Sequence, residues 1–460
     1  MISDLNNFGR HKSFFFVGIG GAGMSAVAIV LKGMGFRVAG SDLKESGYTQ
    51  NLKKKGIQVF IGHNSKNITG FDALIISAAI RSENTEYRSA RNSGIPIYSR
   101  SDALAWILNQ KKGIAVAGTH GKTTTTSMIS FIFRQARLDP TIIIGGELNE
   151  LGTNASFGEG EYIIAEACES DGSFLKYNPF VSVVTNIEED HLDFYKNYEE
   201  IRRSFVSFLN NTKENGFIII NGDDISEVTL EGLKTGRKIF RFGLTEKNDI
   251  IAYDIKPSGS GMSFKIRINK KNYDVKLKIP GIHNVKNCLA SLSCAYLLKL
   301  DIEECIKIIE SFTGVRRRFQ IRGSFNNSVI VDDYAHHPTE IKATLEAAES
   351  LLKEKIITVF QPHRYSRLKA ILDKFDHCFE KTDTLIVTEV YASGENPVPG
   401  VSGKLLIDYL SKNDFNRKLV YLPKMNDIVD YLKQEIKSDN LILIMGAGDI
   451  TRVSDGLLEN

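Results

Sequence analysis

The chain has 460 residues, of which 42% are hydrophobic and 25% charged, and its formal net charge at pH 7 is +3. These values are typical of a soluble globular protein of about three domains, and they give no support to nucleic-acid binding. The polar N-terminal segment and the break of the first apolar run at Gly18 argue against a signal peptide or a membrane span, so the cytosol is the expected location. The five cysteines contain no Cys-x-x-Cys pair and are odd in number, which argues against a zinc knuckle and a disulfide framework.

Between about Ser13 and Leu108, short runs rich in Val, Ile and Phe alternate with helix-length amphipathic stretches. This pattern predicts a parallel sheet covered by helices. A second such unit begins at "GIAVAG". Within it, the alternating segment from Asp249 to Lys278 predicts an antiparallel hairpin that turns near Lys270.

Helical patterns follow from His283 to about Phe312, and a third alternating unit starts near Val315. The sequence therefore predicts an α/β protein of three domains: residues 1–111, 112–314 and 315–460.

The segment "IAVAGTHGKTTTT", from Ile114 to Thr126, predicts a buried strand, a phosphate-binding loop and the first turn of a helix. Val116 stands where the general pattern has its first glycine, so the assignment rests on this context. Lys122 would supply a positive charge to the terminal phosphates of ATP, and Thr123 would place its hydroxyl on Mg²⁺. A glycine-rich turn that only caps a helix is the alternative, and the preceding strand disfavours it.

Such a loop needs an acidic partner for the metal ion, usually at the end of a neighbouring strand. Glu166 in "EYIIAEACESD" fits this role. His191 follows another apolar strand and could bind a second metal ion as a neutral imidazole. A histidine in this place is more often structural, but the flanking Asp190 and Asp193 favour metal binding.

An earlier glycine loop, "GIGGAG" at Gly18 to Gly23, also follows a predicted strand, and Asp42 ends the next strand. Taken alone, this pattern predicts an NAD-dependent dehydrogenase. Its backbone amides could equally hold another diphosphate. Two nucleotide loops in one chain favour a transfer enzyme whose substrate itself carries a nucleotide.

The combined motifs resemble the Mur ligase family over essentially the full length, most closely its members that add L-alanine. The resemblance rests on "GIGGAGMSAVA", "GTHGKTTTT", "EACESDGSFL", "VTNIEEDHLD", "GIHNVKNCLA", "GVRRRFQ", "VDDYAHHPTEI", "FQPHRYSR", "VYASGE" and "GAGDI", in the order of the family. It implies an N-terminal Rossmann-like domain for the UDP portion, a central phosphate-loop ATPase domain and a C-terminal Rossmann-like domain for the amino acid.

The resemblance also implies the reaction: ATP-dependent joining of the lactyl carboxylate of UDP-N-acetylmuramate to the amino group of L-alanine, the first amino-acid addition in peptidoglycan precursor synthesis. A carboxylate is a poor electrophile, so an acyl phosphate and then a tetrahedral intermediate are expected. Lys122 would spread the charge of phosphoryl transfer. The base for the amine stays open between His191, His336 and substrate phosphate.

The residues that the resemblance assigns fall into four groups. The UDP-sugar would contact Gly18, Gly20, Gly21, Ala22, Gly23, Met24, Ser25, Asp42, His63 and Ser77. ATP would contact Gly118, Thr119, His120, Gly121, Lys122, Thr123, Thr124, His283, Asn284, Asn287, Arg318 and Asp333. The amino acid would contact Tyr334, His336, His363 and Arg364. One or two Mg²⁺ ions, with Mn²⁺ able to replace them, would be held by Thr123, Glu166 and His191.

Local alternatives exist for several of these segments. "HNVKN" could only cap a helix, the arginines of "GVRRRF" could be a solvated surface, and part of "DDYAHHP" is turn chemistry before Pro338. The chain departs from the family at Cys168, where aspartate is usual, and at Ser393, where alanine is usual. The first change removes a negative charge beside the expected metal ligand.

Three rival functions remain at this point: the recycling ligase that attaches a preformed tripeptide to the same UDP-sugar, a dehydrogenase, and a non-catalytic regulator that binds a UDP-sugar. "FQPHRYSR" favours the alanine enzyme over the first, and the loop at Lys122 argues against the other two. Neither a nucleic acid nor a membrane is expected as a partner, and the chain would act as a monomer or a homodimer.

Overall fold

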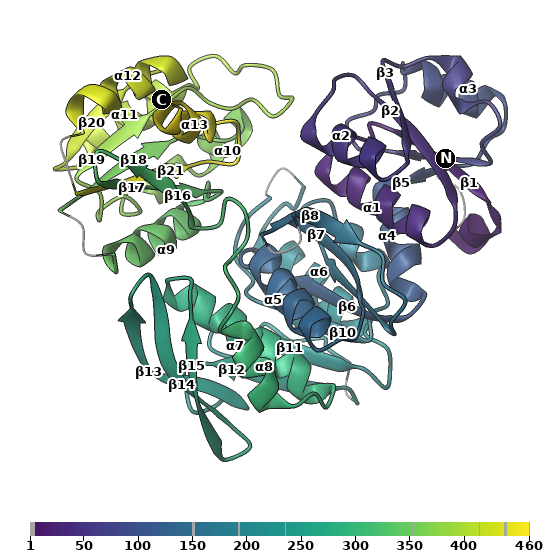
Figure 1. Cartoon of the computed structure of the whole chain (residues 1–460), viewed down its shortest axis with the longest axis horizontal. Helices are drawn as coiled ribbons and strands as arrows, with labels where there is room; N and C mark the ends of the chain where they lie inside the picture. Colours follow the sequence, from purple (N-terminus) through teal and green to yellow (C-terminus); the bar gives the residue numbers. More distant parts are fainter. Residues whose placement is uncertain are drawn as a thin grey trace. The chain divides into compact units, whose positions relative to one another are not determined.

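The computed structural model of the chain contains three sheets and describes residues 5–149, 152–191, 194–234, 236–351, 354–413, 415–436 and 439–459 (Figure 1). The contacts of the chain divide it into two compact units. Unit one is Met1–Ile251, Arg267–Lys271 and Lys286–Ile309, and unit two is Ala252–Ile266, Asn272–Val285 and Glu310–Asn460. Among the described residues, no helix is both long and apolar enough to cross a membrane.

The first sheet is parallel throughout, as predicted, with the strand order β3-β2-β1-β4-β5. Its strands are β1 (Ser13–Val17), β2 (Arg37–Asp42), β3 (Gln58–Ile61), β4 (Ala73–Ile76) and β5 (Ile97–Ser99). The helices of this part are η1 (Leu5–Arg10), α1 (Ala22–Gly33), α2 (Gly47–Lys54), η2 (Ser65–Ile68), α3 (Thr85–Asn92) and α4 (Arg100–Asn109). The strand order reverses at β1, and the loop after β1 therefore lies where open α/β sheets bind their ligands.

The second sheet has ten strands in the order β15-β14-β13-β12-β11-β10-β6-β9-β7-β8. The strands are β6 (Lys112–Ala117), β7 (Thr141–Leu148), β8 (Thr153–Ser156), β9 (Tyr162–Glu166), β10 (Val181–Val184), β11 (Phe217–Asn221), β12 (Lys238–Gly243), β13 (Ile250–Ser258), β14 (Gly261–Ile268) and β15 (Lys271–Leu277). The helices are α5 (Lys122–Gln135), η3 (Ser173–Lys176), α6 (Tyr198–Asn210), α7 (Ile282–Leu297) and α8 (Ile302–Ile309). The neighbours β10 and β9 flank β6 in parallel, so polar residues at all three carboxyl ends meet at the phosphate loop.

The segment from Asp249 to Lys278, predicted as one hairpin, contains three strands, β13, β14 and β15, and the turn predicted near Lys270 joins the last two. Asn269 and Lys270 form this turn, and both have positive φ values, 47° and 63°. Two successive residues with positive φ are the geometry of the tight hairpin turns that match the twist of the strands.

The helical patterns predicted from His283 to Phe312 are present as two helices, α7 and α8. Lys299, with φ of 66°, follows the first helix, and Asp301 accepts the backbone N–H of Glu304 at 3.0 Å as the cap of the second.

The third sheet has the order β16-β17-β21-β18-β19-β20 and lies in unit two. Its strands are β16 (Gln320–Phe325), β17 (Ser328–Asp333), β18 (Lys355–Phe360), β19 (Thr384–Val387), β20 (Lys418–Tyr421) and β21 (Asn440–Met445). The helices are α9 (Pro338–Glu349), α10 (Tyr365–Ala370), η4 (Leu372–Phe375), α11 (Gly403–Lys412), α12 (Met425–Glu435) and α13 (Arg452–Leu458). Only the edge strand β16, which the sequence pattern did not predict, runs antiparallel to its neighbour.

Alternate residues of these strands enter two different cores, as the two-residue period of a strand requires. Leu441 and Leu443 of β21 join a core with α9, α10 and α11. Ile442 and Ile444 of the same strand join a core with α12 and α13. Helices therefore cover both faces of this sheet, which leaves the carboxyl ends of its parallel strands as the place for polar residues.

Candidate active site

The predicted phosphate loop lies between β6 and α5. Gly118, with φ of 138°, and Gly121, with φ of 80°, both have backbone conformations that favour glycine. A methyl group at Gly118 would overlap the side-chain oxygen of Thr185, and one at Gly121 would lie 2.6 Å from Oδ1 of Asn287. The loop therefore needs glycine at both positions, and Gly121 leads directly into the N-terminus of α5, as in other anion-binding loops.

Two polar residues that follow β10 hold this loop in place. Asn186 accepts the backbone N–H of His120 at 2.8 Å and donates to the carbonyl of His120 at 3.1 Å. Thr185 donates to the same carbonyl at 2.5 Å. The sequence prediction did not single out these two residues, although they stand in the quoted motif "VTNIEEDHLD".

Lys122 begins α5 and is turned back into the loop. Its ammonium donates to the carbonyls of Gly118 at 2.5 Å and Thr119 at 3.0 Å, and to Oε1 of Glu169 at 2.8 Å. Burial opposes the charge of Lys122, but the carboxylates of Glu169 and Glu166 outweigh it and raise the pKa of Lys122. The loop therefore carries a permanent cation.

Glu169 is the main partner of this cation and was missing from the predicted site residues. Its side chain is 3% exposed, and its Oε2 has no hydrogen-bond partner among the described residues. Burial acts to raise the pKa of Glu169, but Lys122 and His191 outweigh it and hold that pKa below its usual value. Glu169 is therefore an anion with one oxygen left without a protein donor.

Thr123 and Glu166 meet as predicted. The Thr123 hydroxyl lies 3.1 Å from both carboxylate oxygens of Glu166, and the backbone N–H of Gly145 donates to Oε2 of Glu166 at 2.8 Å. A hydroxyl, a carboxylate and the unpartnered Oε2 of Glu169 are hard oxygen donors, the class that Mg²⁺ prefers. The residues present fit this ion.

His191 also reaches this group. Its Nε2 lies 3.4 Å from Oε1 of Glu169 and 3.5 Å from Oδ2 of Asp190, and its backbone has a positive φ of 55°. The other acidic neighbour named in the sequence analysis, Asp193, lies outside the described residues. The structure thus brings Lys122, Thr123, Glu166 and His191 together at one end of the second sheet, with Glu169 between them.

Of the residues expected at adenine and ribose, Asn287 lies against the phosphate loop. Its Oδ1 accepts the Thr125 hydroxyl at 3.1 Å, which ties α7 to α5. Asn284 is buried and donates to the carbonyl of Pro280 at 2.7 Å. Burial, aided by the charge of Arg318, lowers the pKa of His283 to about 4, so this imidazole is neutral near pH 7.

The first glycine loop connects β1 to α1 and is braced by β2. The amides of Gly18 and Ile19 donate to the carbonyl of Ser41 at 2.8 and 2.9 Å, and the amide of Gly20 donates to Oδ2 of Asp42 at 2.8 Å. Asp42 thus holds the loop, a role that the sequence pattern did not distinguish from contact with a ligand. The loop leads into α1, whose first turn contains Ala22, Gly23, Met24 and Ser25.

Three other residues belong to the same edge of the first sheet. His63 follows β3, and its Nδ1 lies 2.8 Å from Oε2 of the buried Glu86. Ser77 follows β4, and its amide donates to the carbonyl of Val17 at the end of β1. Arg100, which was not predicted, has its guanidinium beside Gly23 and makes no hydrogen bond or ion pair with any described residue.

In unit two, the residues predicted for the amino acid form one cluster of rings. The ring of His336 lies 5.7 Å from that of Tyr334 and 5.5 Å from that of His363. His363 stacks on Tyr391, with 5.8 Å between ring centroids and 13° between planes. Arg364 joins the cluster through its backbone N–H, which donates to the carbonyl of Tyr391 at 2.9 Å. The sequence motif "VYASGE" contains Tyr391, but its place in this cluster was not predicted.

His363 is a neutral member of this cluster. Burial, together with the neighbouring His336, Arg367 and Arg364, lowers the pKa of His363 to about 3. The guanidinium of Arg367 donates to its Nδ1 at 3.1 Å, which requires that nitrogen to lack a proton.

The arginines of "GVRRRF" have different roles. Arg317 donates to the carbonyls of Gly448 at 3.0 Å and Gly446 at 2.6 Å, so it links two loops of unit two. Arg318 lies over the Tyr334 ring at 5.2 Å, and its guanidinium makes no hydrogen bond with the described residues. Of these two, Arg318, the predicted residue, is therefore the one whose donors are available.

Asp333 fixes two nearby backbone segments through hydrogen bonds. Its two carboxylate oxygens accept the backbone N–H groups of Phe319 at 2.6 Å and Ala335 at 2.7 Å. Burial raises the pKa of Asp333 to about 6, although Arg318 and these two amides act in the opposite direction. The geometry gives Asp333 a local role, and its predicted contact with ATP stays a prediction.

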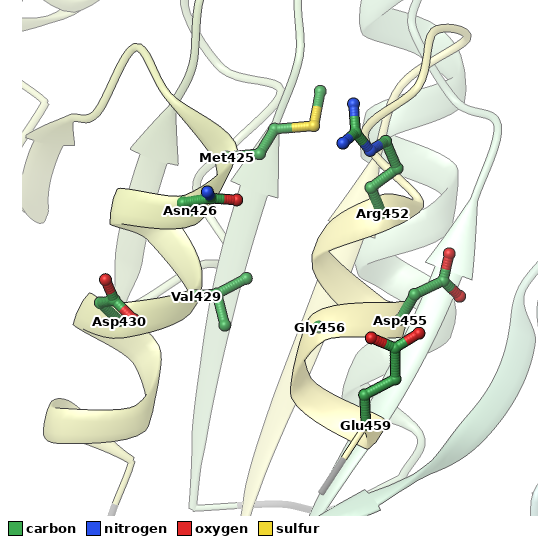
Figure 2. A pocket seen from close by; sticks show the side chains of 8 residues that line it. All are labelled: Met425, Asn426, Val429, Asp430, Arg452, Asp455, Gly456 and Glu459. Carbon is green, nitrogen blue, oxygen red and sulfur yellow. The ribbon is translucent and has the colours of Figure 1, made fainter.

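Unit two has another hollow, between α12 and α13, lined by Met425, Asn426, Val429, Asp430, Arg452, Asp455, Gly456 and Glu459 (Figure 2). Figure 2 shows the carboxylates of Asp430, Asp455 and Glu459 and the guanidinium of Arg452 among the side chains that line it. None of the predicted site residues lines this hollow, and it shares no residue with the ring cluster.

Comparison with known proteins identifies the family. Three family models match in succession: "Mur ligase family, catalytic domain" at residues 13–112, "Mur ligase middle domain" at 116–295, and "Mur ligase, glutamate ligase domain" at 317–448. The UDP-N-acetylmuramate–L-alanine ligase of Acetivibrio thermocellus is 43% identical, over 100% of this chain and 97% of that protein. The enzyme of the same name from Geotalea daltonii is 41% identical, over 98% of each chain.

A solved structure gives the same result for the fold. The crystal structure of the UDP-N-acetylmuramate–alanine ligase of Thermotoga maritima matches with a TM-score of 0.82 and 31% identity, over 97% of this chain and 98% of that one. The predicted α/β architecture of three successive domains is thereby confirmed. The chain belongs to the Mur ligase family.

Proposed function

We propose that this enzyme joins the amino group of L-alanine to the lactyl carboxylate of UDP-N-acetylmuramate, with ATP converted to ADP and phosphate. The observation that carries the proposal is the convergence of Lys122, Thr123 and Glu166 on the loop after β6. A phosphate loop with a lysine, a hydroxyl and a carboxylate is built for phosphoryl transfer from a nucleoside triphosphate. The full-length similarity to two relatives named for this reaction supports the choice of substrates.

The three domains divide the substrates between them, at residues 1–111, 112–314 and 315–460. The first glycine loop, with Gly18 to Ser25, Asp42, His63 and Ser77, holds the UDP-sugar. The second loop holds the phosphates of ATP, with His283, Asn284 and Asn287 at the nucleoside. Arg318 and Asp333 complete the ATP site, and the ring cluster with Tyr334, His336, His363 and Arg364 takes L-alanine.

In the first step, an oxygen of the lactyl carboxylate attacks the terminal phosphorus of ATP, and the bond from that phosphorus to the bridging oxygen of ADP breaks. The products are ADP and an acyl phosphate. Lys122 supplies a cation to the oxygens that gain charge, because its ammonium is held at the loop by Glu169. The backbone amides of the loop add fixed donors that need no rearrangement during the step.

In the second step, the neutral amine of L-alanine attacks the acyl carbon and forms a tetrahedral intermediate, which then expels inorganic phosphate. The amine loses one proton on the way to the amide. His191, His336 and the departing phosphate are the candidates for its acceptor, and each has a basic atom of suitable kind. The neutral imidazole of His363 favours an uncharged amine over an ammonium ion.

Mg²⁺ would be held by Thr123 and Glu166, with Glu169 and His191 available for a second ion, and Mn²⁺ would be accepted by the same donors. When bound, the ion neutralises charge on the phosphate oxygens. The substrates are small molecules. An enzyme that uses ATP and a UDP-sugar acts in the cytosol, where both are supplied.

Phosphate release by the purified enzyme tests the proposal. The assay requires UDP-N-acetylmuramate and compares L-alanine, glycine, L-serine and the tripeptide of the recycling reaction, with the product mass measured in each case. Phosphate release with L-alanine and a product heavier by one alanyl residue is the expected result. Turnover with the tripeptide alone would assign the chain to the recycling reaction instead.

Lys122→Ala should abolish phosphate release while calorimetric binding of UDP-N-acetylmuramate remains. Lys112→Ala is the matched control, because Lys112 begins β6, the strand that leads into the loop, but is exposed and paired with Glu161. Substantial turnover by Lys122→Ala would refute the assignment of the phosphate loop.

A further inference from the structure

Glu86 is a fully buried carboxylate in the first turn of α3, and the proposed reaction does not use it. Its Oε2 accepts the Ser41 hydroxyl at 2.5 Å and Nδ1 of His63 at 2.8 Å. Its Oε1 accepts the backbone N–H of Asn64 at 3.2 Å and the side-chain amide of Asn67 at 2.8 Å. No lysine or arginine among the described residues pairs with it, so four uncharged or imidazole donors stabilise the site of this carboxylate.

Ser41 connects Glu86 to the first glycine loop. Its hydroxyl donates to Glu86, while its carbonyl accepts the amides of Gly18 and Ile19. The neighbouring amide of Gly62 donates to the carbonyl of Asp42 at 2.8 Å, which fixes the end of β3 beside the end of β2. Ser41 is thus the single residue that connects the Glu86 carboxylate to the glycine loop.

The bond to Glu86 also determines which nitrogen of His63 is available. A carboxylate only accepts hydrogen bonds, so Nδ1 of His63 must carry a hydrogen. The Nε2 atom makes no hydrogen bond with the residues that the structure describes, and the side chain is 13% exposed. His63 therefore presents Nε2 away from the buried network, at the carboxyl end of the edge strand β3.

We propose that Glu86 is a positioning residue for the UDP-sugar site, which holds the His63 ring so that Nε2 meets the uridine part of the substrate. This inference rests on the proposed function. In folds of this kind the diphosphate lies over the loop after β1 and the nucleoside extends past the end of β2, so His63 on β3 lies on the nucleoside side. With Nδ1 bound to Glu86, Nε2 is the ring nitrogen left to meet a hydroxyl or imide group of uridine.

A purely structural role would make a different prediction. In that case loss of the carboxylate would lower stability and reduce the amount of active enzyme without a selective change in nucleotide affinity. Glu86→Gln separates the two roles, because an amide has the same shape but a single acceptor oxygen. At least one of the four donors then loses its acceptor, and the His63 ring is no longer fixed by a carboxylate.

The first measurement is calorimetric binding of UDP to the full-length enzyme and to Glu86→Gln, His63→Ala and the double variant. The expected result is a dissociation constant raised about five- to tenfold in each single variant, the range of one lost hydrogen bond. The double variant should bind no more weakly than His63→Ala, because Glu86 acts through His63. Unchanged binding by Glu86→Gln, or independent losses that multiply in the double variant, would overturn the proposal.

Glu83→Gln is the matched control, since Glu83 lies just before α3 but is exposed, and its side chain accepts the hydroxyl of its neighbour Ser82. In the phosphate-release assay, Glu86→Gln should raise KM for UDP-N-acetylmuramate and leave kcat and KM for ATP within twofold. If the wild type binds UDP but shows no turnover, the proposed function fails, while the binding comparison still decides the role of Glu86.

Nitrogen NMR of enzyme labelled with ¹⁵N-histidine gives an answer that does not depend on variants that fold poorly. We expect the His63 signals of the wild type to show a protonated Nδ1, and its Nε2 signal to shift on addition of UDP. A His63 ring with its hydrogen on Nε2 alone, or an Nε2 signal that UDP does not affect, would refute the inference.

Discussion

Replacing Glu169 by glutamine removes the buried negative charge that faces Lys122. The two charged groups are 2.8 Å apart, and their side chains are 14% and 3% exposed. At an effective dielectric constant of about 20, the attraction at this distance is about 6 kcal/mol before the loss of hydration is subtracted. Loss of one partner from a buried pair typically costs about 3–5 kcal/mol. Glutamine still accepts a hydrogen bond from Lys122, so we expect Glu169→Gln to destabilise the loop by about 2–3 kcal/mol.

The effect should depend on pH in a defined way. Glu169 has a folded-state pKa below its usual value, so its contribution is present above the unfolded pKa of about 4.5 and is lost as the pH falls through the folded value. Lys122 has a raised folded-state pKa, so its contribution is present below about 10.5 and is lost as the pH rises through the folded value. The difference in stability between the wild type and Glu169→Gln should therefore stay constant from about pH 5.5 to 9.5 and shrink below about pH 4.5.

Hydrogen exchange measured by mass spectrometry reports this loss locally. Peptides that cover 117–127 and 166–174 should exchange about 30- to 150-fold faster in Glu169→Gln at pH 7, the factor that corresponds to 2–3 kcal/mol. Glu161→Gln is the control: its ion pair with Lys112 has a similar length, 2.7 Å, but is solvent-exposed, so its loss should leave hydrogen exchange nearly unchanged. Equal exchange in wild type and Glu169→Gln would refute the claim that this pair stabilises the loop.

Three further substitutions test other parts of the structure. Gly118→Ala should abolish phosphate release and lower the melting temperature. The φ of 138° and the overlap with Thr185 should together reduce the free energy of unfolding by about 2–4 kcal/mol. Gly35→Ala, whose methyl group would meet open space, is the control and should reduce it by about 1–2 kcal/mol. Arg317→Lys should raise KM for L-alanine and destabilise unit two by about 1–2 kcal/mol, because one ammonium cannot replace the forked contact with Gly446 and Gly448; an unchanged KM and melting curve would contradict this. His363→Gln should reduce the loss of melting temperature between pH 7 and pH 5, since the unfolded state protonates near 6.5 and the folded state only near 3, so acid favours unfolding of the wild type. An identical pH dependence in both proteins would show that His363 is not the group responsible.

The sequence was sufficient to predict the parallel sheets and the loops at their carboxyl ends. Apolar runs followed by glycine mark the ends of β1 and β6, and parallel pairing then brings the end of β9 beside the loop, which is why Glu166 could be predicted. The edge strands β8 and β16 were missed because they are short or partly exposed and lack a long apolar run. Local pattern alone does not reveal an edge strand of this kind.

The residues missed at the site depend on how the chain turns after a strand. Glu169 lies three residues beyond the end of β9, and only the course of that segment brings its carboxylate to Lys122 instead of solvent. The three consecutive arginines pose the same difficulty, because nothing in their order distinguishes Arg317, which links two loops, from Arg318, which keeps its donors available. Tyr391 enters the ring cluster through a turn after β19 whose geometry the sequence does not specify.

The two glycine-rich loops are built in the same way, but they differ in what a phosphate of the proposed substrates must displace. In each, a residue at the end of a neighbouring strand fixes a backbone amide: Asp42 holds Gly20, and Asn186 holds His120. Protein groups of neighbouring strands therefore hold the shape of both loops. The second loop also contains a lysine that already makes three hydrogen bonds, two of them to carbonyls of the loop itself. A phosphate oxygen that contacts Lys122 must compete with those carbonyls, so the affinity for ATP is a difference between two sets of bonds, and Glu169 keeps the ammonium in place during the exchange.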